Sequence, residues 1–594
     1  MKKNFFKYIV GTFLFLNLVS CMNKNDKKKS VELEQIANLY YEDYLRLHPL
    51  DATMQGDTRY NQLLPVNISS DFIQKDTAVY NNYLNQLGKV DYTNLSDDDK
   101  VVYDALKYII IDKRDYYLYR PELIPFTQFD GLPLQFPLLG SGQGSQPFKT
   151  VKDYEDWIQR MEAFPLWMEQ AKKNFEEGIK IKMVLPKVLV QKMIPQMNAE
   201  EIISKDENKN IFFGPIRNFP ADFSDAQKQS LRSKFQEVVF QKIVPSYIDM
   251  GLFLKNDYLP NARATDGYNK LPNGDNIYKY FVKSWTTTNQ IPEDIFQIGK
   301  IQVEILRAEM LKIKDELGFD GSLFDFTYHI AKDPKATPYK TSEEVLNAFQ
   351  SILTKISPKL KTMFHVTPKT PFEVRQTEKF REATASAEYI QGTPDGKRPG
   401  IFYVPLPEPS KYNVTSGMES LFLHEAIPGH HYQISLQQEN ESLPKFLRFG
   451  WLGAYGEGWA HYCETLGSEL GLYTDPYQRM GYLNDQMLRA VRLVVDVGLH
   501  TGMLNREIAM AYYLNNIADT EANATSAIER YMAMPGQALA YKIGSLKIIE
   551  LKEKYQKQLG TKFNVADFHQ EVLSQGCLPL DVLERKMENW AKKQ

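Results

Sequence analysis

Residues 424–431 have the sequence His-Glu-Ala-Ile-Pro-Gly-His-His. The whole chain of 594 residues contains nine histidines, so three within eight residues form an unusual cluster. In a helical His-Glu-x-x-His motif, two histidines one turn apart hold zinc while the glutamate polarises a water. Here Pro428 occupies the position of the second histidine. The cluster therefore predicts a metal site on a helix, with His424 as one ligand and a second histidine beyond the proline.

The second ligand is either His430 or His431. In an unbroken helix His431 would share a face with His424, at about 20° of rotation but about 10.5 Å along the axis. His430 would lie about 120° away from that face. Pro428 interrupts a helix and Gly429 adds backbone freedom, so a broken turn could bring His430 beside His424. The sequence leaves both histidines open and favours His430. The competing interpretation is a helix end at which the histidines cap free carbonyl groups.

A second cluster follows at residues 453–464. Glu457, His461 and Glu464 are spaced i, i+4 and i+7, which places them on one face of a helix. Glu457 resembles the third ligand that glutamate-type zinc peptidases take from a downstream helix, and the alternative is a solvated glutamate. His461 and Glu464 would then orient the ligands. Three protein ligands leave a fourth position for water, as in catalytic zinc sites.

Three segments together resemble a known family. They are residues 424–431, Glu-Gly-Trp-Ala at 457–460 and Pro-Gly-Gln-Ala-Leu-Ala-Tyr-Lys-Ile-Gly at 535–544. This combination resembles the bacterial domain-of-unknown-function (DUF) family 885, over nearly all of the mature chain. Members of that family are commonly lipoproteins and look like distant relatives of the zincin metallopeptidases. The resemblance implies a mainly α, large helical zincin-like fold with a small β-sheet.

The expected activity is hydrolysis of peptide (amide) bonds, in short peptides, by a metal-activated water. Zinc is the expected cofactor because His-His-Glu ligation favours it. Glu425 would serve as the general base. Tyr541, Arg530 and then His500 are the candidates to stabilise the oxyanion. The alternative is a non-catalytic, ligand-binding surface lipoprotein with a degenerate zinc site, an interpretation that Pro428 keeps open.

The N-terminus predicts the compartment. Lys2 and Lys3 precede an apolar stretch at residues 5–18 that is too short and interrupted to span a bilayer comfortably. Leu18-Val19-Ser20-Cys21 resembles a bacterial lipobox, in which Cys21 is acylated after cleavage. The alternative is an ordinary signal peptide with a chance cysteine. We expect a lipoprotein signal peptide at 1–20, a flexible tether at 21–31 and a metallopeptidase-like domain at 32–594, with its active-site part at about 370–594. The protein would be lipid-anchored to a membrane of the cell envelope.

Composition narrows the remaining classes. A net charge of −3 with dispersed lysines gives no indication of nucleic-acid binding. The mature chain retains only Cys463 and Cys577 after Cys21, which excludes a disulfide scaffold and a four-cysteine zinc site.

Periodicity predicts a mostly helical chain. The segments with helical spacing are 30–48, 153–175, 225–254, 292–317, 342–356 and 477–510. Residues 401–404 form a β-prone run, and 182–190 form a weaker one. Residues 395–404 could supply an edge strand to which a peptide substrate adds itself.

Overall fold

The computed structural model describes residues 29–377, 382 and 386–594. The predicted signal peptide, Cys21 and the tether up to residue 28 lie outside the described residues. Helix α1 begins at Val31, where the Ser30 side chain accepts a hydrogen bond from the backbone N–H of Leu33. The chain is therefore already helical at residue 31, which was predicted to be the last residue of the flexible tether.

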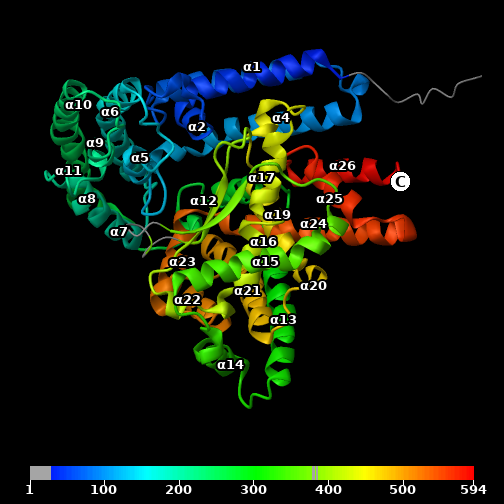
Figure 1. Ribbon diagram of the computed structural model, residues 1–594. Coiled ribbons are helices and arrows are strands. Elements are labelled where there is room, and N and C mark those ends of the chain that lie inside the picture. Colours follow the sequence, from blue (N-terminus) through cyan, green and yellow to red (C-terminus); the bar gives the residue numbers. More distant parts are fainter. Residues whose placement is uncertain (1–28, 378–381, 383–385) are drawn as a thin grey trace, which may run out of the picture.

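The N-terminal helices form an upper layer and a lobe at the left of Figure 1. The upper layer consists of α1 (Val31–Leu47), α2 (Pro49–Met54), α3 (Ser70–Leu87) and α4 (Asp97–Tyr116). The lobe consists of α5 (Leu132–Gly140), α6 (Val151–Ile181), α7 (Lys187–Met197), α8 (Glu200–Ile203), α9 (Gly214–Arg217), α10 (Asp225–Val238) and α11 (Val244–Phe253). Two short π-helical segments, Val239–Ile243 and Leu254–Tyr258, follow α10 and α11, so the helix predicted at 225–254 is present.

The remaining helices form the body of the protein. Those before the sheet are α12 (Gly274–Thr286), α13 (Pro292–Glu316), α14 (Leu323–Lys332) and α15 (Ser342–Met363). Those after it are α16 (Met418–Glu425), α17 (His430–Glu439), α18 (Lys445–Arg448), α19 (Gly453–Thr465), α20 (Gly467–Leu470), α21 (Pro476–Thr501), α22 (Arg506–Asn516), α23 (Glu521–Ala533), α24 (Ala540–Leu559), α25 (Val565–Leu573) and α26 (Leu580–Ala591). The predicted mainly α fold with a small sheet is confirmed.

The small sheet has three strands, β1 (Phe372–Gln376), β2 (Glu388–Ile390) and β3 (Gly400–Val404), in the order β1-β3-β2. Strand β3 pairs in parallel with β1 and antiparallel with β2. The strand predicted at 401–404 is confirmed, but the expectation that 395–404 supplies an edge is wrong. Strand β3 is central and its backbone groups pair on both sides, so it is not free to take up a peptide.

Two predictions from periodicity also need correction. Residues 182–190 do not form a strand: Lys182 ends α6, and the buried Leu189 and Val190 belong to α7. A short apolar run fits a buried helical turn as well as a strand. The segment 477–510 is divided into α21 and α22, because Gly502 (φ 81°) ends α21 and Asn505 caps α22.

Helices α19 and α24 touch through their backbones. A Cβ atom added at Gly544 would lie 1.9 Å from the carbonyl oxygen of Ala454, and one at Gly458 would lie 2.6 Å from Cα of Gly544. Only hydrogen atoms fit between the two helices at this crossing. The contact fixes the distance between the N-terminal turns of α19 and α24, which carry two of the predicted site residues.

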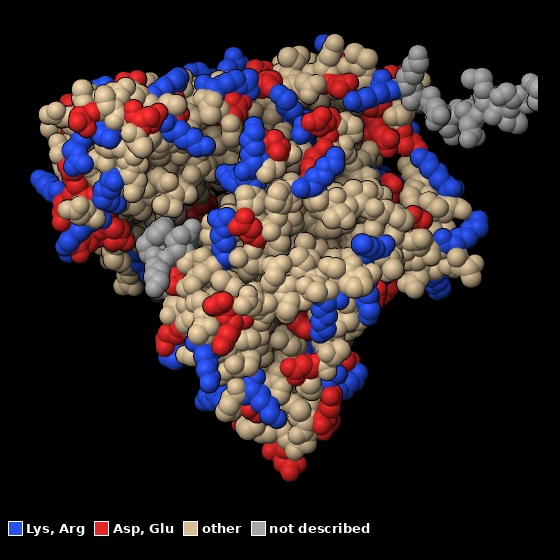
Figure 2. Space-filling view, in the orientation of Figure 1, with Lys and Arg blue, Asp and Glu red and all other residues tan. Residues whose placement is uncertain are grey.

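No helix within the described ranges is both long and apolar enough to cross a bilayer. On the face shown in Figure 2, lysine and arginine side chains are interspersed with aspartate and glutamate.

Candidate metal centre

The segment at 424–431 is a broken helix. Helix α16 ends at Glu425, the chain turns through residues 426–429 with a cis Ile427–Pro428 bond, and α17 begins at His430. A Cβ atom at Gly429 would lie 1.9 Å from the carbonyl oxygen of His424, so the turn requires glycine there. Trp459 on α19 donates from Nε1 to the carbonyl oxygen of Pro428 at 2.9 Å. The broken turn thus places His424 and His430 on different helices with their ring centroids 4.8 Å apart.

The structure brings the three predicted ligands together. One ligand atom from each of His424, His430 and Glu457 lies within 4.8 Å of the others. Glu457 Oε2 is 3.5 Å from Nε2 of His424 and 3.3 Å from Nε2 of His430. Of the two histidines that the sequence left open, His430 joins the cluster.

His431 faces the sheet. Its Nδ1 lies 3.0 Å from the hydroxyl of Tyr389 on β2, and its ring packs against Phe372 on β1. Burial lowers the pKa of His431 to about 4, so the ring is neutral at pH 7. His431 therefore attaches the sheet to α17, and its ring has no part in the cluster.

The donor set fits a zinc ion. His424 uses Nδ1 to donate to Glu464 Oε1 at 2.8 Å, which leaves the Nε2 lone pair directed at the cluster. A carboxylate behind a ligating histidine is the usual arrangement at zinc sites. His424 and His430 are buried, and Glu457 is half-buried. Two imidazole nitrogens and one carboxylate oxygen also match the ligand number of catalytic zinc sites.

The charges at the cluster favour a cation. Burial opposes ionisation of Glu457, but the neighbouring His430 and His424 outweigh it and lower the pKa of that carboxyl. Burial likewise lowers the pKa of His424, yet its hydrogen bonds to Glu457 and Glu464 raise the pKa to about 10. Both shifts come from one attraction: in this poorly solvated site the carboxylates and the imidazoles each favour the charged form of the other.

Glu425 follows His424 at the end of α16 and is buried. Burial raises the pKa of its carboxyl, and the neighbouring Glu457 adds to this effect while His424 and His430 oppose it. A carboxyl with a raised pKa accepts and returns a proton more readily near neutral pH. Its position and its pKa therefore suit the predicted role of general base.

Glu464 is the centre of a buried network behind His424. Its Oε2 accepts from Gln486 Nε2 at 2.9 Å and lies 3.2 Å from His461 Nδ1. Lys542 donates from Nζ to Gln486 Oε1 at 3.0 Å, and burial lowers the pKa of this lysine to about 8. The prediction that His461 and Glu464 lie behind the ligands agrees with this arrangement, whereas Gln486 and Lys542 were missed.

Tyr541, in the first turn of α24, stacks on His424 with ring centroids 6.4 Å apart. The guanidinium carbons of Arg492 and Arg489 on α21 lie 4.9 and 5.8 Å from the centroid of the Tyr541 ring. Burial raises the pKa of Tyr541, so its hydroxyl remains a donor at neutral pH. These two arginines were not predicted. A signal was present, since Arg489 and Arg492 are spaced i and i+3, which places them on one side of a predicted helix.

Arg530, on α23, lies close to Tyr541. Its Nη2 donates to Gln537 Oε1 at 3.3 Å, and its guanidinium carbon lies 4.6 Å from the centroid of the Phe129 ring. Burial and the neighbouring Arg492 lower the pKa of Arg530, and Tyr541 opposes this change. Arg530 therefore lies between the candidate centre and the segment around Phe129.

His500, the third oxyanion candidate, lies elsewhere. Its Nδ1 accepts from the backbone N–H of Tyr268 at 3.3 Å, and its Nε2 is 3.0 Å from the carbonyl oxygen of Tyr531. Both ring nitrogens are used by the backbone, so His500 joins α21 to two other segments and is not a site residue. Asp496, one turn earlier on α21, accepts from the Tyr278 hydroxyl at 2.7 Å and from the backbone N–H of Gly536.

Trp451 is a further residue that the sequence did not single out. It precedes α19, its ring centroid is 5.7 Å from that of His430, and the residue is 44% exposed. A Cβ atom at Gly456 would lie 2.1 Å from the indole, so the ring covers the first turns of α19. An exposed indole beside a candidate ligand offers a surface on which a substrate can pack.

The chain belongs to the DUF885 family of bacterial proteins of unknown function, whose model matches residues 49–587. It is similar to the crystal structure of a candidate lipoprotein from Colwellia psychrerythraea, with a TM-score of 0.86 and 27% identity over 95% of this chain and 100% of that one. A candidate lipoprotein of unknown function from Shewanella oneidensis has the same fold, with a TM-score of 0.71 and 19% identity over 94% and 100% of the two chains. Comparison with curated proteins gives no match.

Proposed function

We propose that this protein is a zinc-dependent hydrolase that cleaves peptide bonds, with a zincin-like metallopeptidase centre. The observation that carries the proposal is the convergence of His424, His430 and Glu457 in one buried cluster. Glu425, the proposed base, directly follows His424 in the sequence. Bound zinc would supply Lewis acidity, which polarises a carbonyl group and lowers the pKa of a water.

The chain's own residues supply the rest of the chemistry. Glu425 takes a proton from the attacking water and returns it to the leaving amine, as its raised pKa favours. Tyr541 donates a hydrogen bond to the oxyanion, and Arg530 contributes positive charge beside it. Glu464 holds the ring of His424 in the orientation that directs Nε2 into the cluster.

The alternative is a lipoprotein that binds a ligand without cleaving it. Its support is that Pro428 occupies the position of the second histidine in the His-Glu-x-x-His motif. That argument loses weight because the turn after Glu425 places His430 beside His424. A glutamate with a raised pKa beside the cluster also favours a hydrolase, since binding alone has no use for a base.

The test measures metal and turnover separately. Elemental analysis of the mature chain should find about one zinc per chain, and His424→Ala should lose it while circular dichroism stays unchanged. Glu425→Gln should keep zinc and lose cleavage of a short-peptide library. Turnover retained in Glu425→Gln would remove Glu425 as the base, and absence of zinc from the wild-type protein after incubation with the metal would refute the metal site.

We further propose that Cys21 carries the lipid that anchors the mature chain to a membrane of the cell envelope. The support is the lipobox-like sequence and the description of the two similar structures as candidate lipoproteins. Mass spectrometry should find acyl chains on the N-terminal peptide, and Cys21→Ser should abolish them. An unmodified Cys21 in the membrane fraction would contradict the proposal.

A further inference from the structure

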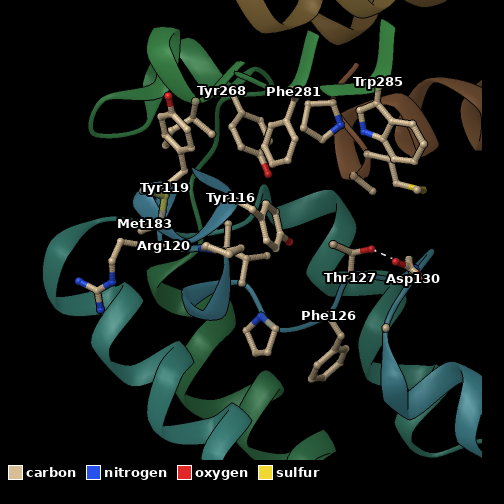
Figure 3. A pocket seen from close by; sticks show the side chains of 18 residues that line it. Tyr116, Tyr119, Arg120, Phe126, Thr127, Asp130, Met183, Tyr268, Phe281 and Trp285 are labelled. Atoms are coloured by element: carbon tan, nitrogen blue, oxygen red, sulfur yellow. Dashed lines mark hydrogen bonds between the residues drawn. The ribbon is translucent and has the colours of Figure 1, made fainter. Parts of the chain in front are cut away.

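A cavity of about 220 Å³ lies between the N-terminal layer and the body (Figure 3). Six aromatic side chains line it: Tyr116, Tyr119, Phe126, Tyr268, Phe281 and Trp285. We call this set the aromatic cage. Tyr116 ends α4, and Phe281 and Trp285 come from α12, so the cage joins segments that are distant in sequence.

Part of the aromatic surface of the cage is accessible to a ligand. Tyr116 is 40% exposed, yet burial raises its pKa. The two observations agree because the accessible part of Tyr116 faces a cavity rather than open solvent. A cavity wall made of aromatic faces carries partial negative charge, which attracts organic cations.

The carboxylate of Asp130 adds a full negative charge to this wall. Its Oδ1 accepts from Gln135 Nε2 at 2.8 Å, and no lysine or arginine in the described part of the chain forms an ion pair with it. Arg120 also borders the cavity, but it bonds to Glu122 at 2.5 Å and Glu177 at 2.7 Å, and Figure 3 shows its side chain extending away. The positive charge of Arg120 is thus neutralised outside the cage, whereas the negative charge of Asp130 has no cationic partner among the described residues.

A second cavity, of about 780 Å³, adjoins the first. Tyr116, Asp130 and Gly131 lie on the wall that the two share. Its lining includes the further carboxylates of Asp51 and Asp112, while its one lysine, Lys113, donates to the hydroxyl of Tyr44 at 3.2 Å. The larger cavity offers room for the remainder of a ligand whose cationic group occupies the cage.

Packed residues connect the cage to the helices that carry the candidate metal centre. Trp285 lies against Gly453, where an added Cβ atom would be 3.2 Å from the indole, and Gly453 begins the helix that carries Glu457 one turn later. Met534 and Pro535 line the cage on the segment between Arg530 and Tyr541. Phe129, next to Asp130 in sequence, packs under the guanidinium of Arg530.

We propose that the aromatic cage and Asp130 bind the cationic group of the substrate, an amine or guanidinium carried by a peptide. This inference rests on the proposed function, because it defines which peptides reach the candidate metal centre. The cation comes either from a lysine or arginine side chain or from a free amino terminus, and both offer the same chemistry to the cage.

The test measures binding by calorimetry on the mature chain with Glu425→Gln, so that turnover is not needed. The probes are Ala-Lys-Ala, Ala-norleucine-Ala and the N-acetylated form of each. We expect loss of one cationic group to weaken binding about tenfold. If norleucine has this effect, the cage holds a side chain; if acetylation has it, the cage holds the amino terminus. Both results support the proposal.

Two variants place the effect at the cage. Asp130→Asn removes the charge, and Tyr116→Leu removes an aromatic face but retains apolar bulk. Each should abolish most of the preference for the cationic probe, while Asp222→Asn, an exposed residue outside both cavities, should retain it. Equal affinity for all four probes, no measurable binding of any, or an unchanged preference in both cage variants would overturn the proposal. Zinc content, measured in the same samples, separates this result from a failure of the metal site.

Discussion

The carboxylate of Glu464 provides the sharpest test of how the centre is organised. It accepts a hydrogen bond from Nδ1 of His424 at 2.8 Å and another from Nε2 of Gln486 at 2.9 Å. The substitution Glu464→Gln preserves size and removes the charge. The new amide can present oxygen to His424 only if its NH₂ group faces the donor nitrogen of Gln486.

The expected cost falls on metal affinity. Loss of a carboxylate behind a ligating histidine typically weakens metal binding about 10- to 100-fold. That range corresponds to about 1.4 to 2.7 kcal/mol of binding free energy. We expect a value within it, because Glu464 is fully buried and no water can replace its contact with His424.

The assay is competition for zinc against a chromophoric chelator, with circular dichroism to confirm the fold. Glu469→Gln is the matched control: it makes the same chemical change on α20, where the exposed carboxylate forms a surface ion pair with Lys552 at 3.2 Å. Zinc affinity of Glu464→Gln within twofold of the wild type would show that His424 is oriented without this carboxylate.

Three further outcomes are expected. In urea denaturation, Gly544→Ala should lower the free energy of unfolding by about 1–3 kcal/mol or more, because the new methyl group has no space between α19 and α24. The control Gly88→Ala, where a Cβ atom would lie at an ordinary contact distance, should change it little. Burial raises the pKa of Asp496 from 3.8 to about 7, so the folded state binds this proton more tightly and the free energy of unfolding should fall as pH rises from about 4 to 7. Asp496→Asn should remove that loss of up to about 4 kcal/mol. Identical stability profiles against pH in the two proteins would contradict the reasoning. Trp451→Ala should raise KM for peptides at unchanged zinc content, since its exposed ring lies beside His430; an unchanged KM would exclude it from the substrate surface.

The fold could be predicted wherever helical spacing extends over many residues, as at 292–317, which became α13. It could not be predicted where the physical signal is short or ambiguous. Residues 182–190 are apolar enough for a strand, but the packing of Leu189 and Val190 into the core favours a helix. The pattern at 477–510 remains helical on both sides of Gly502, so periodicity alone did not locate the break.

The candidate ligands could be predicted because they belong to local motifs in which spacing fixes which side chains share a face. The preference for His430 followed from Pro428 and Gly429, although only the three-dimensional turn distinguishes it from His431. Gln486 and Lys542 were beyond reach for another reason. They meet Glu464 only because α21 and α24 pack against α19, and no local pattern in the sequence encodes that contact.

In the proposed function, chemistry and substrate selection belong to different parts of the chain. The predicted ligands, Glu425 and Tyr541 all lie within residues 424–541, whereas Asp130 and the whole aromatic cage lie before residue 290. The cage aromatics have no helical repeat of their own, because several lie at helix ends and in connections. The sequence therefore predicts the proposed chemistry but not the cage. Because no residue lines both the cage and the proposed centre, and packing contacts such as Trp285 on Gly453 connect them, we expect substitutions in the cage to change which peptide binds while the centre remains intact. Relatives that keep the residues of the centre but differ at Asp130 and Tyr116 should therefore differ in substrate and not in reaction.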